Sequence, residues 1–256
     1  MIGLLVVTVA TPGCFINDLR AKNSLNQGVR DYNKGKFEDA QKKFAFALEL
    51  DPDMPNAGMF HARAVNEQFS QSLDETSGLK ALEAWDGLIK ASANDHEAVD
   101  TAYAFKADIY DQLSNSVDGK KDFYKEKNRE MLLARAELAG ASQKTKADVY
   151  YTIGVGYWDE SYKMSASYTS RKLPIPQDVM DKMRPRIQKA HEYLLKTLSV
   201  DPQYADAFFY EKLVYLEEMK VETNPAKQKE IQAKAKEMED KYLQIQKQKQ
   251  SSSSSS

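Results

Sequence analysis

The sequence is poor in the residues that build disulfide frameworks, metal centres and β-hairpins. It contains one cysteine, Cys14, so no disulfide can form within the chain. The three histidines, His61, His96 and His191, are scattered, and none has a second ligand at the spacing of a metal site. No Asn-Gly or Asp-Gly turn separates two alternating apolar runs. We therefore expect no cofactor, no metal and little or no β-structure.

An excess of charge of one sign is also absent. The 36 Lys and Arg residues nearly balance the 38 Asp and Glu residues, which leaves a net charge of −2. Nucleic-acid binding needs a concentrated basic face, so this balance argues against it. A hydrophobic content of 42% is enough to build a core, which argues against a disordered chain.

The sequence also lacks the short motifs of common enzymes. It has no Gly-x-Ser-x-Gly elbow, no phosphate-binding glycine loop and no His-Glu-x-x-His motif. Gly154 and Gly156 lie in a helical pattern with no strand before them, so they indicate helix packing rather than a dinucleotide turn. We expect no enzymatic activity, and no small-molecule substrate is evident.

No apolar run is long enough to cross a membrane. The run in residues 2–10 has nine residues, whereas a membrane span needs about 20. With Cys14 after Thr-Pro-Gly, "MIGLLVVTVATPGC" resembles a bacterial lipoprotein signal, in which the cysteine is lipidated. Thr11 stands where that pattern usually has Leu, and no basic residue precedes Arg20. Export without a lipid, or an incidental apolar N-terminus, are the alternatives.

The lipoprotein resemblance implies a location. The chain would be exported to the bacterial cell envelope and attached to a membrane through Cys14. Phe15 rather than Asp follows Cys14, and by the same resemblance this favours the outer membrane, with the chain facing the periplasm or the cell surface.

What the sequence does contain is a repeated phrase. "KKFAFALELDPDMPNA" (42–57) returns as "HEYLLKTLSVDPQYADA" (191–207), each with an Asp-Pro before a new helix start. Small residues recur in the preceding helical segments: Gly28, Ala62 after 34 residues, Ala107 after 45 more and Gly154 after 47 more. A recurring packing pattern of this kind indicates stacked helix pairs, because one pair cannot bury its apolar face alone.

This pattern resembles the tetratricopeptide repeat (TPR), a pair of helices spanning 34 residues, along most of the chain. The resemblance implies an all-α, right-handed α-solenoid of about five pairs over residues 17–249. The lipoprotein-like segment at 1–14 lies outside this array, and the serine run predicts a disordered tail at 250–256. The residues that carry the resemblance are Gly28, Ala40, Phe44, Ala47 and Pro52 in the first pair, and Gly154, Tyr157, Ala190, Leu194 and Pro202 in the fourth. The expected repeats are 21–54, 55–94, 95–140, 143–202 and 203–249.

The last helix is expected to begin with Asn224 as its N-cap and Pro225 in its first turn. An apolar stripe then follows at spacings of 4, 3, 4 and 3 residues: Ile231, Ala235, Met238, Tyr242 and Ile245. This stripe either covers the open end of the stack or binds a coiled-coil partner.

The residues in excess of a 34-residue period are expected in long loops inside the pairs, at 70–79, 114–123 and 160–178. The three loops either form a binding lip along one edge or are tolerated surface insertions. The third is the strongest candidate for partner binding, because it contains Tyr162, Tyr168 and Arg171, and tyrosine and arginine often anchor interfaces.

A concave groove is the other expected binding surface. By analogy with TPR proteins, the first helix of each pair should line it with the side chains next to its packing stripe. In the fourth pair these are Tyr151, Val155 and Trp158, which alternatively fill the tight inner curve. The corresponding positions are Met59, Arg63 and Asn66 in the second pair and Ala104, Asp108 and Asp111 in the third.

These observations predict a protein-interaction adaptor tethered at the bacterial envelope, binding a peptide or protein partner in the groove and along the loop edge. The alternative is a structural subunit of a larger surface or secretion assembly.

Overall fold

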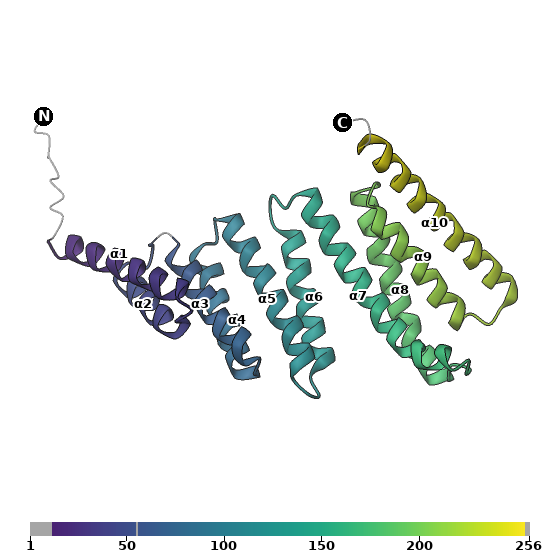
Figure 1. Ribbon diagram of the computed structural model, residues 1–256, viewed down its shortest axis with the longest axis horizontal. Coiled ribbons are helices and arrows are strands. Elements are labelled where there is room, and N and C mark those ends of the chain that lie inside the picture. Colours follow the sequence, from purple (N-terminus) through teal and green to yellow (C-terminus); the bar gives the residue numbers. More distant parts are fainter. Residues whose placement is uncertain (1–11, 55, 254–256) are drawn as a thin grey trace, which may run out of the picture. The chain divides into compact units, whose positions relative to one another are not determined.

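The computed structural model describes residues 12–54 and 56–253, with side chains from Ile16 to Ser251 except that of Pro55 (Figure 1). The described residues form ten α-helices and no strand, which confirms the expected all-α architecture of five helix pairs. The apolar run at 2–10 and the side chain of Cys14 lie outside the described residues.

The helices follow one another with short connections. Their bounds are α1 (Pro12–Asn33), α2 (Phe37–Leu50), α3 (Ala57–Ser72), α4 (Glu75–Ala91), α5 (His96–Ser116), α6 (Lys121–Glu137), α7 (Gln143–Ser170), α8 (Gln177–Val200), α9 (Ala205–Val221) and α10 (Pro225–Ser253). The first helix therefore begins before the expected residue 17. The last helix includes the first serines of the run that was expected to be disordered.

The chain divides into two compact units, residues 1–131 (unit 1) and 132–256 (unit 2). The boundary falls within α6. Near its start, Tyr124 is buried in the core of unit 1, with its ring centroid 6.1 Å from that of Tyr110. In the part of α6 that belongs to unit 2, Ala136 is buried with Val149 and Ile153 of α7.

Within each unit the helices pack in chain order. In unit 1, α1 packs on α2, α2 on α3, α3 on α4 and α4 on α5, and α1 also contacts α3 (Figure 1). In unit 2, α7 packs on α8, α8 on α9 and α9 on α10, and α7 also contacts α9. A first helix that contacts both its own partner and the next first helix is the packing expected of a helical repeat.

Small residues allow the paired helices to approach closely. A Cβ atom added to Gly28 on α1 would lie 2.6 Å from Cε1 of Phe44 on α2, closer than carbon atoms can pack. A Cβ atom on Gly154 of α7 would lie 2.8 Å from Cγ of Leu194 on α8. Ala62 and Ala107, at the matching positions of the second and third pairs, are buried. The small-residue pattern predicted from the sequence is therefore confirmed as helix packing.

The prediction of long loops inside the pairs is wrong, because the extra residues lengthen the helices instead. Only two residues separate α3 from α4; Leu73 adopts a left-handed conformation with φ 53°, and Asp74 caps α4 by accepting from the Ser77 backbone N–H at 2.9 Å. The longest insertion extends α7 to Ser170. This extension is held by Ser165, which is buried and donates a hydrogen bond to Glu217 of α9 at 2.8 Å.

The C-terminal helix covers the end of unit 2. Asn224 Oδ1 accepts a hydrogen bond from the Ala226 N–H at 2.9 Å, which confirms the predicted N-cap. In the apolar stripe of α10, Met238 and Ile245 are buried against Ala205 and Phe208 of α9. The stripe thus serves as a cap on the stack, the first of the two interpretations that the sequence allowed.

Candidate partner-binding groove

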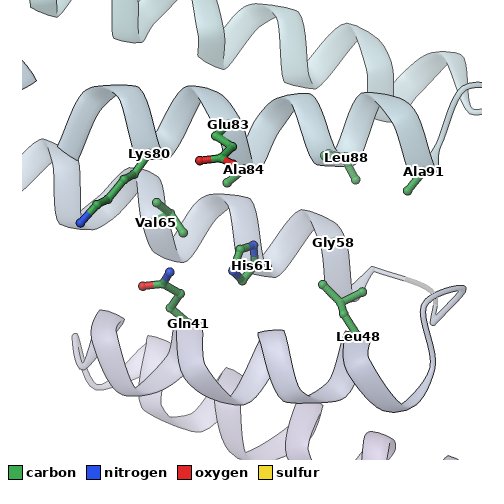
Figure 2. A pocket seen from close by; sticks show the side chains of 11 residues that line it. Gln41, Leu48, Gly58, His61, Val65, Lys80, Glu83, Ala84, Leu88 and Ala91 are labelled. Carbon is green, nitrogen blue, oxygen red and sulfur yellow. The ribbon is translucent and has the colours of Figure 1, made fainter. Parts of the chain in front are cut away.

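A groove opens in unit 1 between the second helices of the first two pairs, α2 and α4, with α3 as its floor (Figure 2). Its volume is about 430 Å³. We call it the α3 groove. It is lined by Gln41, Leu48, Gly58, His61, Val65, Lys80, Glu83, Ala84, Gly87, Leu88 and Ala91.

Small residues on α4 keep the groove open, whereas Leu88 packs closely over Gly58. Leu48 from α2 and Leu88 from α4 point toward each other above the start of α3, where Gly58 lies (Figure 2). A Cβ atom on Gly58 would lie 3.2 Å from Leu88, and one on Gly87 would meet nothing within 4 Å. On α4, Ala84, Gly87 and Ala91 follow at three- and four-residue spacing, so one helix face presents almost no side-chain volume.

The other part of the groove is polar. Gln41 lies on α2 and His61 on α3, and Lys80 and Glu83 lie on α4 (Figure 2). The Oε1 atom of Gln41 accepts a hydrogen bond from Gln68 at 2.9 Å. Burial lowers the pKa of His61, so its imidazole is neutral at pH 7. Lys80 and Glu83 carry opposite charges, and this part of the groove is therefore electrically balanced.

A second hollow adjoins the groove at the helix ends. Its volume is about 700 Å³, and it shares Leu48, Gly58, Leu88 and Ala91 with the α3 groove. We call it the turn-end hollow, because the α2–α3 and α4–α5 turns form much of its wall. Its further lining residues are Pro52, Asp53, Met54, Asn56, Met59, Phe60, Arg63, Ser92, Asp95, Glu97, Ala98 and Thr101. The two spaces therefore adjoin at these four residues.

The turn-end hollow is predominantly acidic. Asp53, Asp95 and Glu97 are exposed along it, and Arg63 is the one cation among its lining residues. Asp95 also caps α5, since its Oδ1 accepts from the Glu97 and Ala98 N–H groups at 3.1 Å. The Arg63 guanidinium lies 5.9 Å from the centroid of the Phe105 ring.

The structure separates the groove residues that the sequence predicted in unit 1. Met59 and Arg63 line the turn-end hollow, so both lie beside the candidate site. Asp108 and Asp111 are exposed on α5, and neither lines the α3 groove or the turn-end hollow. The expectation for Asn66 is wrong: it shares a helix face with buried residues on either side, Ala62 and Phe69, and only 5% of it is exposed.

In unit 2 the predicted groove stripe is covered by α9. The ring of Tyr151 lies 5.0 Å from that of Tyr204 and 5.7 Å from that of Tyr210. Trp158 meets Tyr210 edge-on at 5.1 Å, and Val155 packs in the same apolar cluster. Burial raises the pKa of Tyr151 to about 12. This environment favours the interpretation in which the stripe fills the inner packing of the repeat.

The residues expected in the third loop lie at the end of α7. Tyr162 is 45% exposed, its ring stacks on Trp158 at 5.4 Å, and Lys220 Nζ lies 5.6 Å from its centroid. Tyr168 is half-buried within the helix, and Arg171 is exposed at its C-cap. Tyr162 and Arg171 thus remain accessible, but from the last turns and the C-cap of α7 rather than from a long loop.

Sequence reasoning missed two features. The α3 groove was not predicted, although the stripe of Ala84, Gly87 and Ala91 on a second helix is the signal that could have indicated it. The other is a buried ion pair between α8 and α9. His191 Nδ1 lies 2.6 Å from Oε1 of Glu211, which is fully buried, and His191 Nε2 lies 3.3 Å from Glu218.

The electrostatics of this pair follow from its burial. Burial lowers the pKa of His191, but the two carboxylates outweigh that effect and raise the pKa to about 9. Burial also raises the pKa of the Glu211 carboxyl. Because Glu211 has no exposed surface, the pair stabilises the contact of α8 with α9 and is not available to a partner.

Two kinds of feature are absent from the described residues. No three His, Cys, Asp or Glu side chains gather closely enough there to hold a metal ion. None of the described helices combines the length and apolarity of a membrane-spanning segment.

Comparison with solved structures finds similar proteins at low sequence identity. No family model matches the sequence, and no curated protein does. Two crystal structures of MamA are similar, one at 17% identity over 91% of this chain and 94% of that one with a TM-score of 0.47, the other at 18% over 88% and 96% with 0.44. A monomeric mutant of IFIT1 with Gppp-AAAA is similar at 15% identity over 87% of this chain and 50% of that one, with a TM-score of 0.35.

Proposed function

We propose that this chain is a protein-binding scaffold, and that the α3 groove receives a segment of a partner protein. The observation that supports this most is that the α3 groove, about 430 Å³, adjoins the turn-end hollow, about 700 Å³, between helices of one unit. Ligand pockets in proteins are typically about 300–1,000 Å³. A groove between helices is also a common site for a partner helix.

The lining of the groove suits recognition more than catalysis. Leu48, Ala84 and Ala91 offer accessible apolar surface, and Gly87 on the wall leaves open space in which a partner backbone can approach. The polar side chains stand on three different helices and can fix the orientation of a bound segment. We propose a role in binding and none in catalysis.

The test blocks the groove without disturbing the fold. In Gly87→Leu the new side chain enters open space and fills the groove, whereas Gly87→Ala adds a single carbon at the same position. Each variant is expressed in its native host, and partners are trapped by crosslinking and identified by mass spectrometry. We expect capture by the wild type and by Gly87→Ala, and loss of capture in Gly87→Leu. Equal capture by all three, or crosslinks that avoid α2, α3 and α4, would show that the groove is not the binding site.

We further propose that the scaffold is tethered at the bacterial cell envelope through lipidated Cys14. The support is the resemblance of the first 14 residues to a lipoprotein signal. The acyl chains would hold the helical array at a membrane surface. In cells fed an alkyne fatty acid, the wild type should carry the label and sediment with membranes. Cys14→Ser should lose both properties, and a Cys14→Ser protein that keeps the label would refute the anchor.

A second candidate function, a structural subunit of a larger assembly, is favoured by the first helix pair. Ile16 and Leu19 on α1 and Phe46 on α2 are exposed large apolar side chains. Covering such side chains with another subunit is favourable, because it removes apolar surface from water. The crosslinking experiment separates the two roles: a scaffold gives groove crosslinks to varying partners, whereas an assembly subunit gives crosslinks from α1 at a constant stoichiometry.

A further inference from the structure

We infer that the α3 groove and the turn-end hollow select a basic segment of a partner protein, with one large apolar side chain next to a lysine or arginine. This inference rests on the proposed binding function and specifies the chemistry of the partner. It is argued from two features: an apolar slot between Leu48 and Leu88, and a row of exposed carboxylates on one side of that slot.

The apolar slot lies where the α3 groove and the turn-end hollow meet. Leu48 and Leu88 form its two sides, and both line the groove and the hollow. Gly58 lies beneath them and adds no side chain (Figure 2). A leucine- or phenylalanine-sized side chain placed there is shielded on both sides, and it also determines where the neighbouring residues of the partner lie.

Charge differs on the two sides of the slot. Toward the turns, Asp53, Asp95 and Glu97 are exposed against the single cation Arg63, which leaves two net negative charges. Arg63 is itself directed over the Phe105 ring. A lysine or arginine on this side of the partner would meet carboxylates, whereas an acidic side chain would be repelled.

On the other side of the slot the lining is neutral overall. Lys80 and Glu83 carry opposite charges, and the pKa of His61 is lowered by burial. This half of the α3 groove therefore accepts polar residues without selecting for charge. The cation of the partner should accordingly lie on one side of its apolar anchor only.

The test is a selection that assumes no partner. A phage-displayed library of random 12-residue peptides is selected on the full-length protein, and the enriched peptides are measured by fluorescence anisotropy on purified variants. We expect them to share a large apolar residue with a lysine or arginine within about four positions. They should bind the wild type and Gly87→Ala, and binding should be lost in Gly87→Leu.

Charge variants then test the wall. Asp53→Lys and Glu97→Lys should each weaken an enriched peptide about two- to fivefold, the range of exposed ion pairs, and added salt should reduce that effect. Asp111→Lys, which reverses an exposed carboxylate outside the groove and the hollow, is the matched control and should change nothing.

The outcomes separate the two proposals. Acidic or uncharged peptides that still need an open groove would overturn the basic-segment inference and leave the binding function in place. Peptides that bind Gly87→Leu as tightly as the wild type would refute both the basic-segment inference and the proposed binding function of the α3 groove. If no peptide is enriched, or the wild type forms a dimer that Gly87→Leu cannot form, the inference also fails, since the occupant would then not be a short basic segment.

Discussion

Two glycines in one helix provide a direct test of how the paired helices pack. Gly154 and Gly156 both lie in the middle of α7, two residues apart. A Cβ atom on Gly154 would lie 2.8 Å from Leu194 Cγ and 3.1 Å from the Leu194 backbone nitrogen. A Cβ atom on Gly156 would meet nothing within 4 Å. The same substitution, glycine to alanine, therefore enters a closed space at one position and an open one at the other.

The magnitudes follow from two opposing terms. Replacing glycine by alanine in a helix interior stabilises it by about 0.5–1 kcal/mol, and this term is the same at both positions. Overpacking a well-filled contact costs about 1–3 kcal/mol, and only Gly154→Ala meets it. The backbone nitrogen of Leu194 cannot rotate away, so α7 and α8 must move apart. Gly156→Ala should thus raise the free energy of unfolding, and Gly154→Ala should lower it by about 1 kcal/mol.

The measurement can report on unit 2 through its tryptophan. The chain has two tryptophans, Trp85 in unit 1 and Trp158 in unit 2, so the Trp85→Phe background leaves Trp158 as the only indole reporter. Urea titrations followed by its fluorescence should place the two alanine variants on opposite sides of the parent. Their midpoints should differ by about 1 M, given an m-value of about 1–3 kcal/mol/M. Coincident midpoints would refute the claim that a glycine is needed where α7 meets α8.

Three further predictions concern unit 2. The double variant Tyr151→Ala with Trp158→Ala should lower the stability of unit 2 by several kcal/mol in thermal melts followed by circular dichroism, because both rings pack on α9. An unchanged melting transition would show that the two rings are not core residues and would favour a role in partner binding. His191→Ala should cost about 3–5 kcal/mol in urea titrations by leaving Glu211 buried and unpaired, and adding Glu211→Leu should recover most of that loss. Because the pKa of His191 is about 9 in the folded protein and 6.5 for an unperturbed histidine, its stabilisation is complete below about pH 6.5 and is lost as pH rises through 9. The raised pKa of Glu211 acts in the same direction, so the wild-type urea midpoint should fall as pH rises. The double variant His191→Ala with Glu211→Leu lacks both groups, and its midpoint should fall less.

The helix pairs could be predicted because their packing depends on local spacing. Gly28 and Phe44 belong to helices joined by a three-residue turn, so the sequence distance between them determines which helix faces meet. The same is true of Asn224, whose side chain caps a helix that begins at the next residue. Contacts between residues this close in the sequence can be predicted without knowing which distant parts of the chain meet.

The placement of the extra residues could not be predicted in the same way. The stretch 160–178 contains serines, tyrosines and a Leu-Pro-Ile-Pro segment, which suggested a loop. The structure continues the helix to Ser170 because Ser161 and Ser165 are buried, and Ser165 bonds to Glu217. Glu217 is 52 residues away along the chain, and the helix propensity of the local residues carries no information about such a distant contact.

The candidate site shows the same division. Met59 and Arg63 were expected beside a binding surface and lie in the turn-end hollow, but the α3 groove forms only when α2, α3 and α4 stack. His191 and Glu211 likewise meet only across two helices.

By itself, then, the amino-acid order determined that this chain forms helices in pairs, and which small side chains let the first four pairs close. Only the tertiary structure decided which faces stay uncovered. The reason is physical: helix formation and pairing depend on neighbours within one or two turns, whereas an open groove is the space that three stacked helices together fail to fill.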